Sequence, residues 1–492
     1  MVKLQAIILG AFLACSAKAE TIACTTPPPP PTCTTGTCPP TVTDNNVVYG
    51  YSNNLIGNLN TITGSGNTVQ GFVNNIAGNN NLNLGSYANI VGSSNAAQGN
   101  YNQIAGNLNG VIGSVNTVVG SANGVNGNYN AVVGDLNKLV GDANLVSGSV
   151  NTVSGNLNTI ANGNYNVISG AQNVVNTGNY NGIIGTANYV QGSANLVNGT
   201  ANALVGNFNT VGGASNNVAG SGNGVAGNCN NLVGDSNGVV GSGNNLNGYS
   251  NIVQGDVNTL QGSFNNIGGS ANTAIGYSNN ILGVSNTAIG SNNNLYGALN
   301  SVLGNQNTAT GVANTIVGNS NLAAGVGNSQ IGSGNVAVGN ANSQFGFNNT
   351  AIGCANSAVG TGNTQIGSGN LAYGNNNNIE GSVNTVVGNT NLAVGNANTI
   401  IGDTNSVGGN CNQVSGVSNT VLGNANIAVG NTNYISGSSN AVNGISNGVI
   451  GSGNLVYGSS NNIVSTNACD IPLPPPPPAY PQPVIVNAGC AC

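Results

Sequence analysis

Charged side chains are almost absent from this sequence of 492 residues. It contains three Lys or Arg residues, nine Asp or Glu residues, no His and no Trp. Nucleic-acid binding depends on clustered cations that release counterions from phosphates, so the composition excludes it. General acid–base catalysis needs His or paired carboxylates, and the acidic residues here stand singly along the chain. We therefore expect no enzyme, no cofactor and no partner that is a nucleic acid.

Long apolar runs are missing after the N-terminus. Residues 1–19 contain Lys3, the apolar run Leu4–Cys15 and a final Ala-Lys-Ala, which is typical of a signal peptide cleaved before Glu20. No later segment reaches the roughly 18 apolar residues of a membrane helix. We therefore expect a secreted protein, located outside the cell, at its surface or in its wall, with no membrane span in the mature chain.

Cysteine is sparse and gathers at the two ends. Residues 20–49 and 467–492 are rich in Pro, with Thr as well in the first, and we expect extended polyproline segments there. In an oxidising compartment their cysteines would form disulfides or cross-links between chains. These segments either cap the ordered region or cross-link it to neighbours. A metal site is disfavoured because no His is available. The flanking cysteines are Cys24, Cys33, Cys38, Cys469, Cys490 and Cys492, and three more lie inside at Cys229, Cys354 and Cys411.

Glycine, in contrast, is abundant and periodic. From Gly50 to Gly458 a glycine opens every unit of seven residues, and fifty-nine units follow the pattern G-x-x-N-x-h-x, where h is aliphatic. Asn fills the fourth position in all units except one, where Ala88 replaces it. Two units carry one extra residue, near Asn162 and near Thr177. A period kept this long indicates a repeat architecture.

The repeat predicts an all-β fold, a parallel β-solenoid or β-roll. A helix is disfavoured because each unit contains a Gly, which costs about 1 kcal/mol relative to Ala in a helix, and at least one Asn. Disorder is disfavoured because the sixth position is aliphatic in nearly every unit from Leu55 to Ile267. Short strands with glycine turns, each coil stacked on the previous one, satisfy both observations.

Stacking also explains the missing charges. Equivalent residues of neighbouring coils would lie about 4.8 Å apart. A repeated charge would face like charges on both sides, at roughly 1 kcal/mol per neighbour even in water. Asn behaves oppositely, because its amide can donate to one neighbour and accept from the other. We therefore expect the fourth position to form an Asn ladder that closes a turn or lines the interior.

The sixth position sets the length of a coil. After Gly269 small and large residues alternate there, largely with a period of fourteen. The two extra residues are fifteen apart, which would place them at one corner of adjacent coils. We therefore predict coils of about 14 residues with two strands each, about 29 in all, in a first section over 50–268 and a second over 269–466. The small residues are Ala274, Ala288, Ala309, Ala323, Ala337 and Ala351, and between them lie Ile281, Leu295, Ile316, Gln330 and Gln344.

The second section resembles the YadA-like head repeat of trimeric autotransporter adhesins. The motif NTAIG occurs at Asn272–Gly276, Asn286–Gly290 and Asn349–Gly353, and NVAVG at Asn335–Gly339. The resemblance is best over 269–430 and looser over 50–268. It implies a left-handed β-roll, a trimer, and binding to extracellular matrix or host surfaces. We expect neither the charged stalk nor the membrane anchor of that family.

Apolar residues at the seventh position, such as Ile275 and Phe345, would leave one face of the coil uncovered, so we expect a homo-oligomer or polymer. Our main hypothesis is a secreted structural or adhesive rod whose partners are extracellular matrix or surface glycans. The alternative is an ice-binding or carbohydrate-binding solenoid that uses ladders of Thr and Asn. Thr is frequent at the fifth position but interrupted by other residues, which disfavours a lattice match. A ligand for a specific receptor is a third hypothesis.

Two sequons are present in the repeats. Asn198, in NGT, and Asn348, in NNT, are the predicted N-glycosylation sites. Few others arise, because the heptad seldom places Ser or Thr two residues after Asn.

Overall fold

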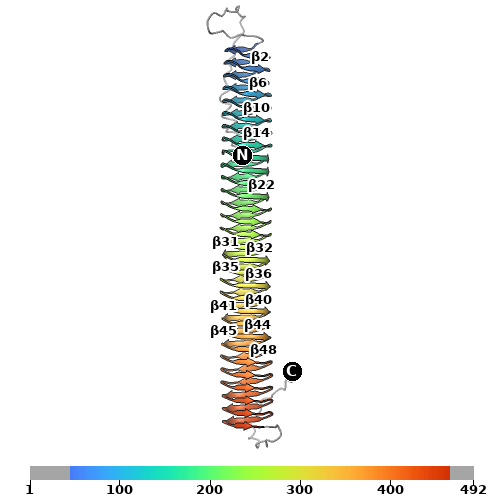
Figure 1. Ribbon diagram of the computed structural model, residues 1–492, viewed down its shortest axis with the longest axis vertical. Helices are drawn as coiled ribbons and strands as arrows, with labels where there is room; N and C mark the ends of the chain where they lie inside the picture. The colour runs from blue at the N-terminus through green and yellow to red at the C-terminus, as the bar shows by residue number, and fades with distance from the viewer. Residues whose placement is uncertain (1–44, 466–492) are drawn as a thin grey trace, which may run out of the picture. The chain divides into compact units, whose positions relative to one another are not determined.

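The computed structural model describes residues 45–465, and over this range the chain is an all-β parallel β-solenoid (Figure 1). It contains sixty short strands, two per coil, and no helix among the described residues. The predicted fold class and the coil of 14 residues are therefore confirmed. The proposed signal peptide, most of the N-terminal segment, the C-terminal tail and the six flanking cysteines lie outside the described residues. Within residues 45–465 no helix is long and apolar enough to cross a bilayer.

Two compact units make up the described chain, one ending at Asn109 and one beginning at Gly110. In the first unit, odd-numbered strands pair only with odd-numbered strands and even with even, all in parallel. Val47 lies opposite Thr61 in one stack, and Asn54 lies opposite Thr68 in the other. Its strands are β1 (Val47–Tyr49), β2 (Asn54–Ile56), β3 (Thr61–Thr63), β4 (Thr68–Gln70), β5 (Asn75–Ala77), β6 (Leu82–Leu84), β7 (Asn89–Val91), β8 (Ala96–Gln98) and β9 (Gln103–Ala105).

The second unit runs from β10 (Gly110–Ile112) to β60 (Asn462–Val464) by the same rule. For example, β33 (Thr273–Tyr277) pairs in parallel with β35 (Thr287–Ser291), and Thr273 lies opposite Thr287, fourteen residues away. Strands lie across the long axis of this unit and stack along it (Figure 1). At about 4.8 Å per coil its roughly 25 coils extend for about 120 Å.

In a typical strand the second residue points into the solenoid, and the residues before and after it point outward. In β35 the side chain of Ala288 is fully buried, while Thr287 is half-buried and Ile289 is 37% exposed. This alternation is the period of two expected of a strand, so the sixth position of every heptad is internal and the fifth and seventh are external. We call the outward fifth and seventh positions of the odd-numbered strands the odd-strand face, and those of the even-numbered strands the even-strand face.

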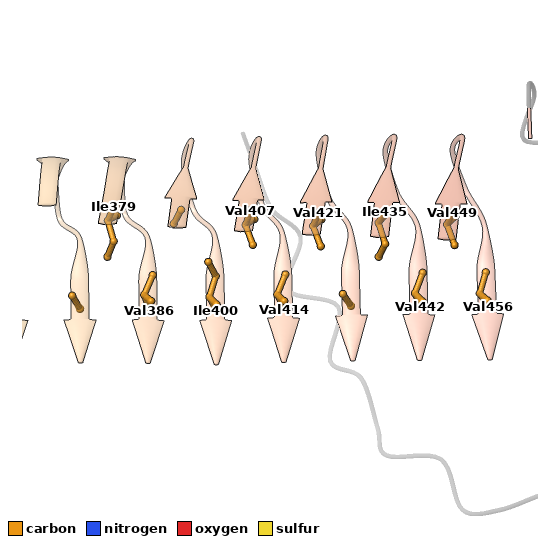
Figure 2. Packing of buried hydrophobic residues seen from close by; sticks show 13 residues of the cluster. Ile379, Val386, Ile400, Val407, Val414, Val421, Ile435, Val442, Val449 and Val456 are labelled. Carbon is orange, nitrogen blue, oxygen red and sulfur yellow. The ribbon is translucent and has the colours of Figure 1, made fainter. Parts of the chain in front are cut away.

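The interior is a single layer of side chains between the two stacks. Figure 2 shows Ile379, Val407 and Val421 from even-numbered strands pointing toward Val386 and Ile400 from odd-numbered strands. All five are at most 1% exposed. Because each coil is so thin, this column of sixth-position residues is the whole apolar core, and each coil is held mainly by the coils next to it.

Small and large core residues face one another across the coil. Ala274 and Ala288 are buried in the odd stack where the even stack carries Ile281 and Leu295. Further along the chain the assignment is reversed, and the even stack supplies the alanines. The predicted alternation of small and large residues is therefore a packing rule between the two stacks.

Where the even-numbered strands carry Ala at the sixth position, some of the odd-numbered strands carry a buried Gln there. The Gln330 amide donates to the carbonyl oxygen of Leu322 on the opposite strand and to Oε1 of Gln344, both at 2.8 Å. The long side chain thus crosses the coil over the space that alanine leaves. The amide donors of Gln330 find partners inside the coil, whereas its own Oε1 is buried without a hydrogen-bond partner.

The glycine that opens each unit is required by the turn. Gly290 has φ of +127°, and a Cβ at that position would overlap the carbonyl oxygen of Gly304 in the next coil. A side chain is therefore excluded both by backbone conformation and by the close approach of two coils. The third position of most turns also has positive φ, near 58°, but there the residue projects to the outside.

The fourth-position asparagines form the predicted ladder, and it both closes the turn and lines the interior. The Asn286 side chain donates to Oδ1 of Asn272 at 3.1 Å and to the carbonyl oxygen of Gly297 at 2.8 Å. Its own Oδ1 accepts from the backbone and side-chain amides of Asn300, both at 3.0 Å. Both donors and the acceptor oxygen are satisfied, so burial of this amide leaves no polar group unpaired.

The two extra residues lie in adjacent coils, as predicted. They follow β17 (Thr159–Ile160) and interrupt β19 (Val174–Thr177), which pair with each other. The register of β19 against β21 (Tyr189–Gln191) shifts between Val175 and Thr177. The backbone amide of Gly178 donates to the carbonyl oxygen of Asn162, so the two insertions stack at one edge.

Candidate functional site

The odd-strand face carries an uninterrupted column of hydroxyl groups. Eight successive odd-numbered strands present Ser or Thr at the fifth position, each paired in register with the next. The residues are Thr259, Thr273, Thr287, Ser301, Thr315, Ser329, Ser343 and Ser357, on β31 (Thr259–Ser263), β33, β35, β37 (Ser301–Leu303), β39 (Thr315–Val317), β41 (Ser329–Ser333), β43 (Ser343–Phe347) and β45 (Ser357–Thr361).

A column of apolar side chains runs parallel to the hydroxyl column. From β33 to β45 the seventh position is Ile, Leu, Val or Phe in every strand, and most of these side chains are exposed. Two residues along a strand separate the columns by about 6.6 Å, and coils repeat at about 4.8 Å. The result is a regular grid in which a column of hydroxyl groups runs beside a column of hydrocarbon groups. The apolar residues are Ile275, Ile289, Leu303, Val317, Ile331, Phe345 and Val359.

Polar side chains extend the first column toward the N-terminus. Asn217, Asn231 and Asn245 occupy the fifth position of the three odd-numbered strands that precede Thr259. Their amides bond to one another at 2.9 Å and 3.1 Å, so they form an exposed Asn ladder on the surface. Polar groups therefore occupy the fifth position of eleven successive odd-numbered strands.

The two faces differ in charge and in smoothness. Across the described strands, the outward positions of the odd-strand face include no charged residue and no glycine. The even-strand face includes Lys138 and Glu380, and nine of its outward positions are glycines, such as Gly224 and Gly238. Only the odd-strand face thus offers a continuous neutral surface of side chains.

The carboxylates of the described turns act as members of a hydrogen-bond ladder. Asp135 Oδ1 accepts the backbone N–H of Ser121 at 2.6 Å, and Asp256 accepts that of Ser242 at 2.7 Å. Asn305 does the same for Ser291 at 2.8 Å, so Asp here substitutes for Asn. Among residues 45–465 no three His, Cys, Asp or Glu side chains come together as metal ligands.

The sequons and the internal cysteines all lie away from the odd-strand face. Asn198 is exposed on the even-strand face, in β22 (Leu196–Thr200), and Asn348 is exposed in a turn with φ of 52°. Cys229 and Cys411 lie in turns that lead into odd-numbered strands, and Cys354 is the last residue of the even-numbered strand β44 (Thr350–Cys354). Glycosylation of Asn198 and Asn348 remains a prediction.

The hydroxyl column was not predicted from the sequence, because the fifth positions of all heptads were treated as one series. Successive heptads alternate between the two faces, so a Thr column on one face is interrupted in the sequence by residues of the other. Reading only every second heptad from Thr259 reveals the run of Ser and Thr. The fourteen-residue period contained this signal.

One comparison with known families bears on function. A family model described as the grass antifreeze beta roll matches residues 139–234. No curated protein matches the chain. The match covers part of the second unit and lies before the hydroxyl column. It supports the ice-binding alternative better than the adhesin hypothesis.

The resemblance to YadA-like adhesin heads is wrong. The family model that matches residues 139–234 is the antifreeze beta roll, and it gives no support for a trimeric autotransporter. The motifs that carried the resemblance, such as NTAIG at Asn272–Gly276, have a local explanation. Asn belongs to the internal ladder, Ala fills the core opposite a large residue, and Gly is required by the turn. Any solenoid with this coil geometry can therefore show the same sequence motif, whatever its family.

Proposed function

We propose that this protein binds ice through the odd-strand face between Thr259 and Val359. The observation that carries the proposal is the paired grid of hydroxyl and hydrocarbon groups on seven successive coils, from Thr273 and Ile275 to Ser357 and Val359, with an eighth hydroxyl at Thr259. The antifreeze beta-roll match at residues 139–234 supports ice binding by this solenoid, and the choice of the face rests on the grid alone.

The chemistry of the face suits a solid water surface. Ice presents a regular lattice, so its partner has to present groups at regular spacing on a rigid support. The coil repeat supplies the spacing, and the internal Asn ladders hold it. Hydroxyl groups can occupy positions of lattice water, while the adjoining methyl groups gain from leaving liquid water. A fixed charge would hold its own hydration shell and disturb this order.

Ice binding also accounts for the exposed apolar column without a partner chain. Ile331 is 43% exposed and Phe345 is 58% exposed, and the sequence led us to expect that another copy of the chain covers such seventh-position residues. In this proposal the protein acts outside the cell, without catalysis, and the solid water surface covers that column. Secretion rests on the predicted signal peptide.

Thermal hysteresis and inhibition of ice recrystallisation by the purified full-length protein test the proposal. Thr315→Lys places a long charged side chain in the middle of the hydroxyl column, and we expect it to lower both activities several-fold. Thr308→Lys is the matched control, because Thr308 occupies the same heptad position on the even-strand face, in β38 (Thr308–Val312). We expect this control to retain activity.

Absence of both activities in the wild type, or equal losses in the two variants, would contradict the proposal. Sedimentation of the wild type separates it from the structural-rod hypothesis. A monomer with ice activity supports an ice-contact face, whereas a multimer that loses ice activity on assembly favours coverage by other copies.

A further inference from the structure

Two pairs of tyrosine rings stack at the edge of the solenoid. The ring centroids of Tyr87 and Tyr101 lie 4.7 Å apart with planes inclined by 3°, and those of Tyr165 and Tyr180 lie 4.9 Å apart at 6°. The first pair belongs to the first compact unit and the second pair to the second unit. All four rings are between 49% and 64% exposed.

The coil geometry produces these stacks. All four residues occupy the third position of a turn, with φ between 58° and 60°. Equivalent positions of adjacent coils lie about 4.8 Å apart, which is close to the stacking distance of two aromatic rings. The backbone N–H of Tyr101 donates to Ser86 at 2.9 Å and that of Tyr180 to Asn164 at 3.1 Å, so the backbones that carry the rings are fixed.

Tyrosine is the main oxidisable side chain of the described region. The sequence contains no His, no Trp and one Met, Met1. Besides three cysteines, the phenols are therefore the groups that a one-electron oxidant finds in residues 45–465. A phenoxyl radical formed in either pair has a second phenol facing it.

We propose that the Tyr87–Tyr101 and Tyr165–Tyr180 pairs are sites of dityrosine formation, driven by a peroxidase with hydrogen peroxide. Each phenol loses one electron and one proton, and the two radicals join through a carbon–carbon bond between ring carbons next to the hydroxyl groups. The ring hydrogens on these carbons then move to restore the phenols. The pair loses two hydrogen atoms in total, and hydrogen peroxide is reduced to two molecules of water.

Proximity favours coupling within the pair over coupling between chains. The partner ring is already in contact, which corresponds to a high effective concentration. Both rings are half exposed, so rotation about their side-chain bonds can bring the reacting carbons together. The product would be a covalent bond between adjacent coils, at the contact on which a solenoid depends. This inference does not rest on ice binding.

The same chain supplies two internal controls. Tyr129 is 67% exposed, more than any paired tyrosine, but the same turn position of its neighbouring coils holds Val115 and Ala143. Tyr277 contacts Phe264 at 5.1 Å with ring planes 59° apart, and a phenylalanine forms no phenoxyl radical. If exposure alone determined where dityrosine forms, Tyr129 would react first. If ring stacking determines it, the two stacked pairs react first.

The test uses dilute full-length protein with blocked thiols, treated with peroxidase and hydrogen peroxide. Dityrosine fluorescence and peptide mapping should reveal a link between residues 87 and 101 and another between 165 and 180, in a monomer lighter by two hydrogens per link. Tyr101→Phe should remove the first link alone and Tyr180→Phe the second. The double variant should lose most of the fluorescence, while Tyr129→Phe should retain it.

Phenylalanine keeps the ring and the stack, so circular dichroism of the variants should match the wild type. Links found only between chains, with a yield that rises with protein concentration, would overturn the proposal. Absence of both linked peptides, or an equal loss in Tyr129→Phe, would overturn it as well.

Discussion

At the scale of single residues, two heptad positions are fixed by contacts between coils. The first-position glycine meets the carbonyl oxygen of the glycine fourteen residues later, and the fourth-position Asn completes four hydrogen bonds in the interior. Ala88 shows what one exception does. Its backbone N–H still donates to Asn74 at 2.9 Å, but it offers no side-chain amide to the ladder. The backbone bonds of Ala88 and the pairing of β5 with β7 therefore maintain the stack locally.

Replacement of a first-position glycine should be strongly destabilising. In Gly290→Ala the new methyl group would overlap the backbone of Gly304, which cannot rotate away as a flexible side chain could. We expect a loss of several kcal/mol, above the roughly 1 kcal/mol typical of a substitution. Urea unfolding followed by circular dichroism, with hydrogen exchange around residues 276–304, would measure it.

Gly224→Ala is the matched control for that experiment. Gly224 lies at an outward position of β26 (Gly224–Ala226), and a Cβ there would meet nothing within 4 Å. We expect stability to be unchanged or raised by up to about 1 kcal/mol, because Ala restricts the unfolded chain. Equal losses in the two variants would contradict the steric explanation.

At the scale of strands, the coil and its core followed from the sequence because they repeat. The seven-residue period, the inward-pointing sixth position and the Asn of the ladder each recur in nearly every unit. One physical argument therefore applies to all the units. The functional face did not follow, since alternate heptads belong to different faces and Thr308 and Thr315 point in opposite directions. The YadA-like resemblance failed for a related reason, because Ala at a core position reflects the size of the residue opposite.

Core packing across the coil can be tested at Gln365. Its amide donates to the carbonyl oxygen of Ser357 at 2.8 Å, but its buried Oε1 has no hydrogen-bond partner. Gln365→Leu removes this unpaired oxygen together with the amide bonds to Ser357 and to the carbonyl oxygen of Asn370 at 3.2 Å, so the two effects oppose each other and we expect a change of at most about 1 kcal/mol. Ala372→Leu adds volume on the facing stack, and we expect a loss of about 1–3 kcal/mol. Thermal unfolding would show a clearly lower midpoint for Ala372→Leu alone.

At the scale of the whole molecule, stability and recognition scale differently with length. Each coil contacts only its neighbours, so removing whole coils from the second unit leaves the remaining contacts intact. Ice recognition, in contrast, depends on how many hydroxyl groups lie in one uninterrupted row. Shortening the unit at different places therefore separates the two properties.

Deletion of two whole coils inside the hydroxyl column should reduce ice activity more than an equal deletion outside it. Removing residues 283–310 joins Leu282 to Gly311, preserves the heptad phase and shortens the column from eight residues to six. Removing residues 402–429 joins Ile401 to Gly430, and eliminates neither a member of the column nor any part of the matched stretch 139–234. We expect both proteins to retain β-sheet circular dichroism, and only the first to show clearly weaker inhibition of ice recrystallisation. Equal losses would mean that total length, and not the hydroxyl column, determines binding.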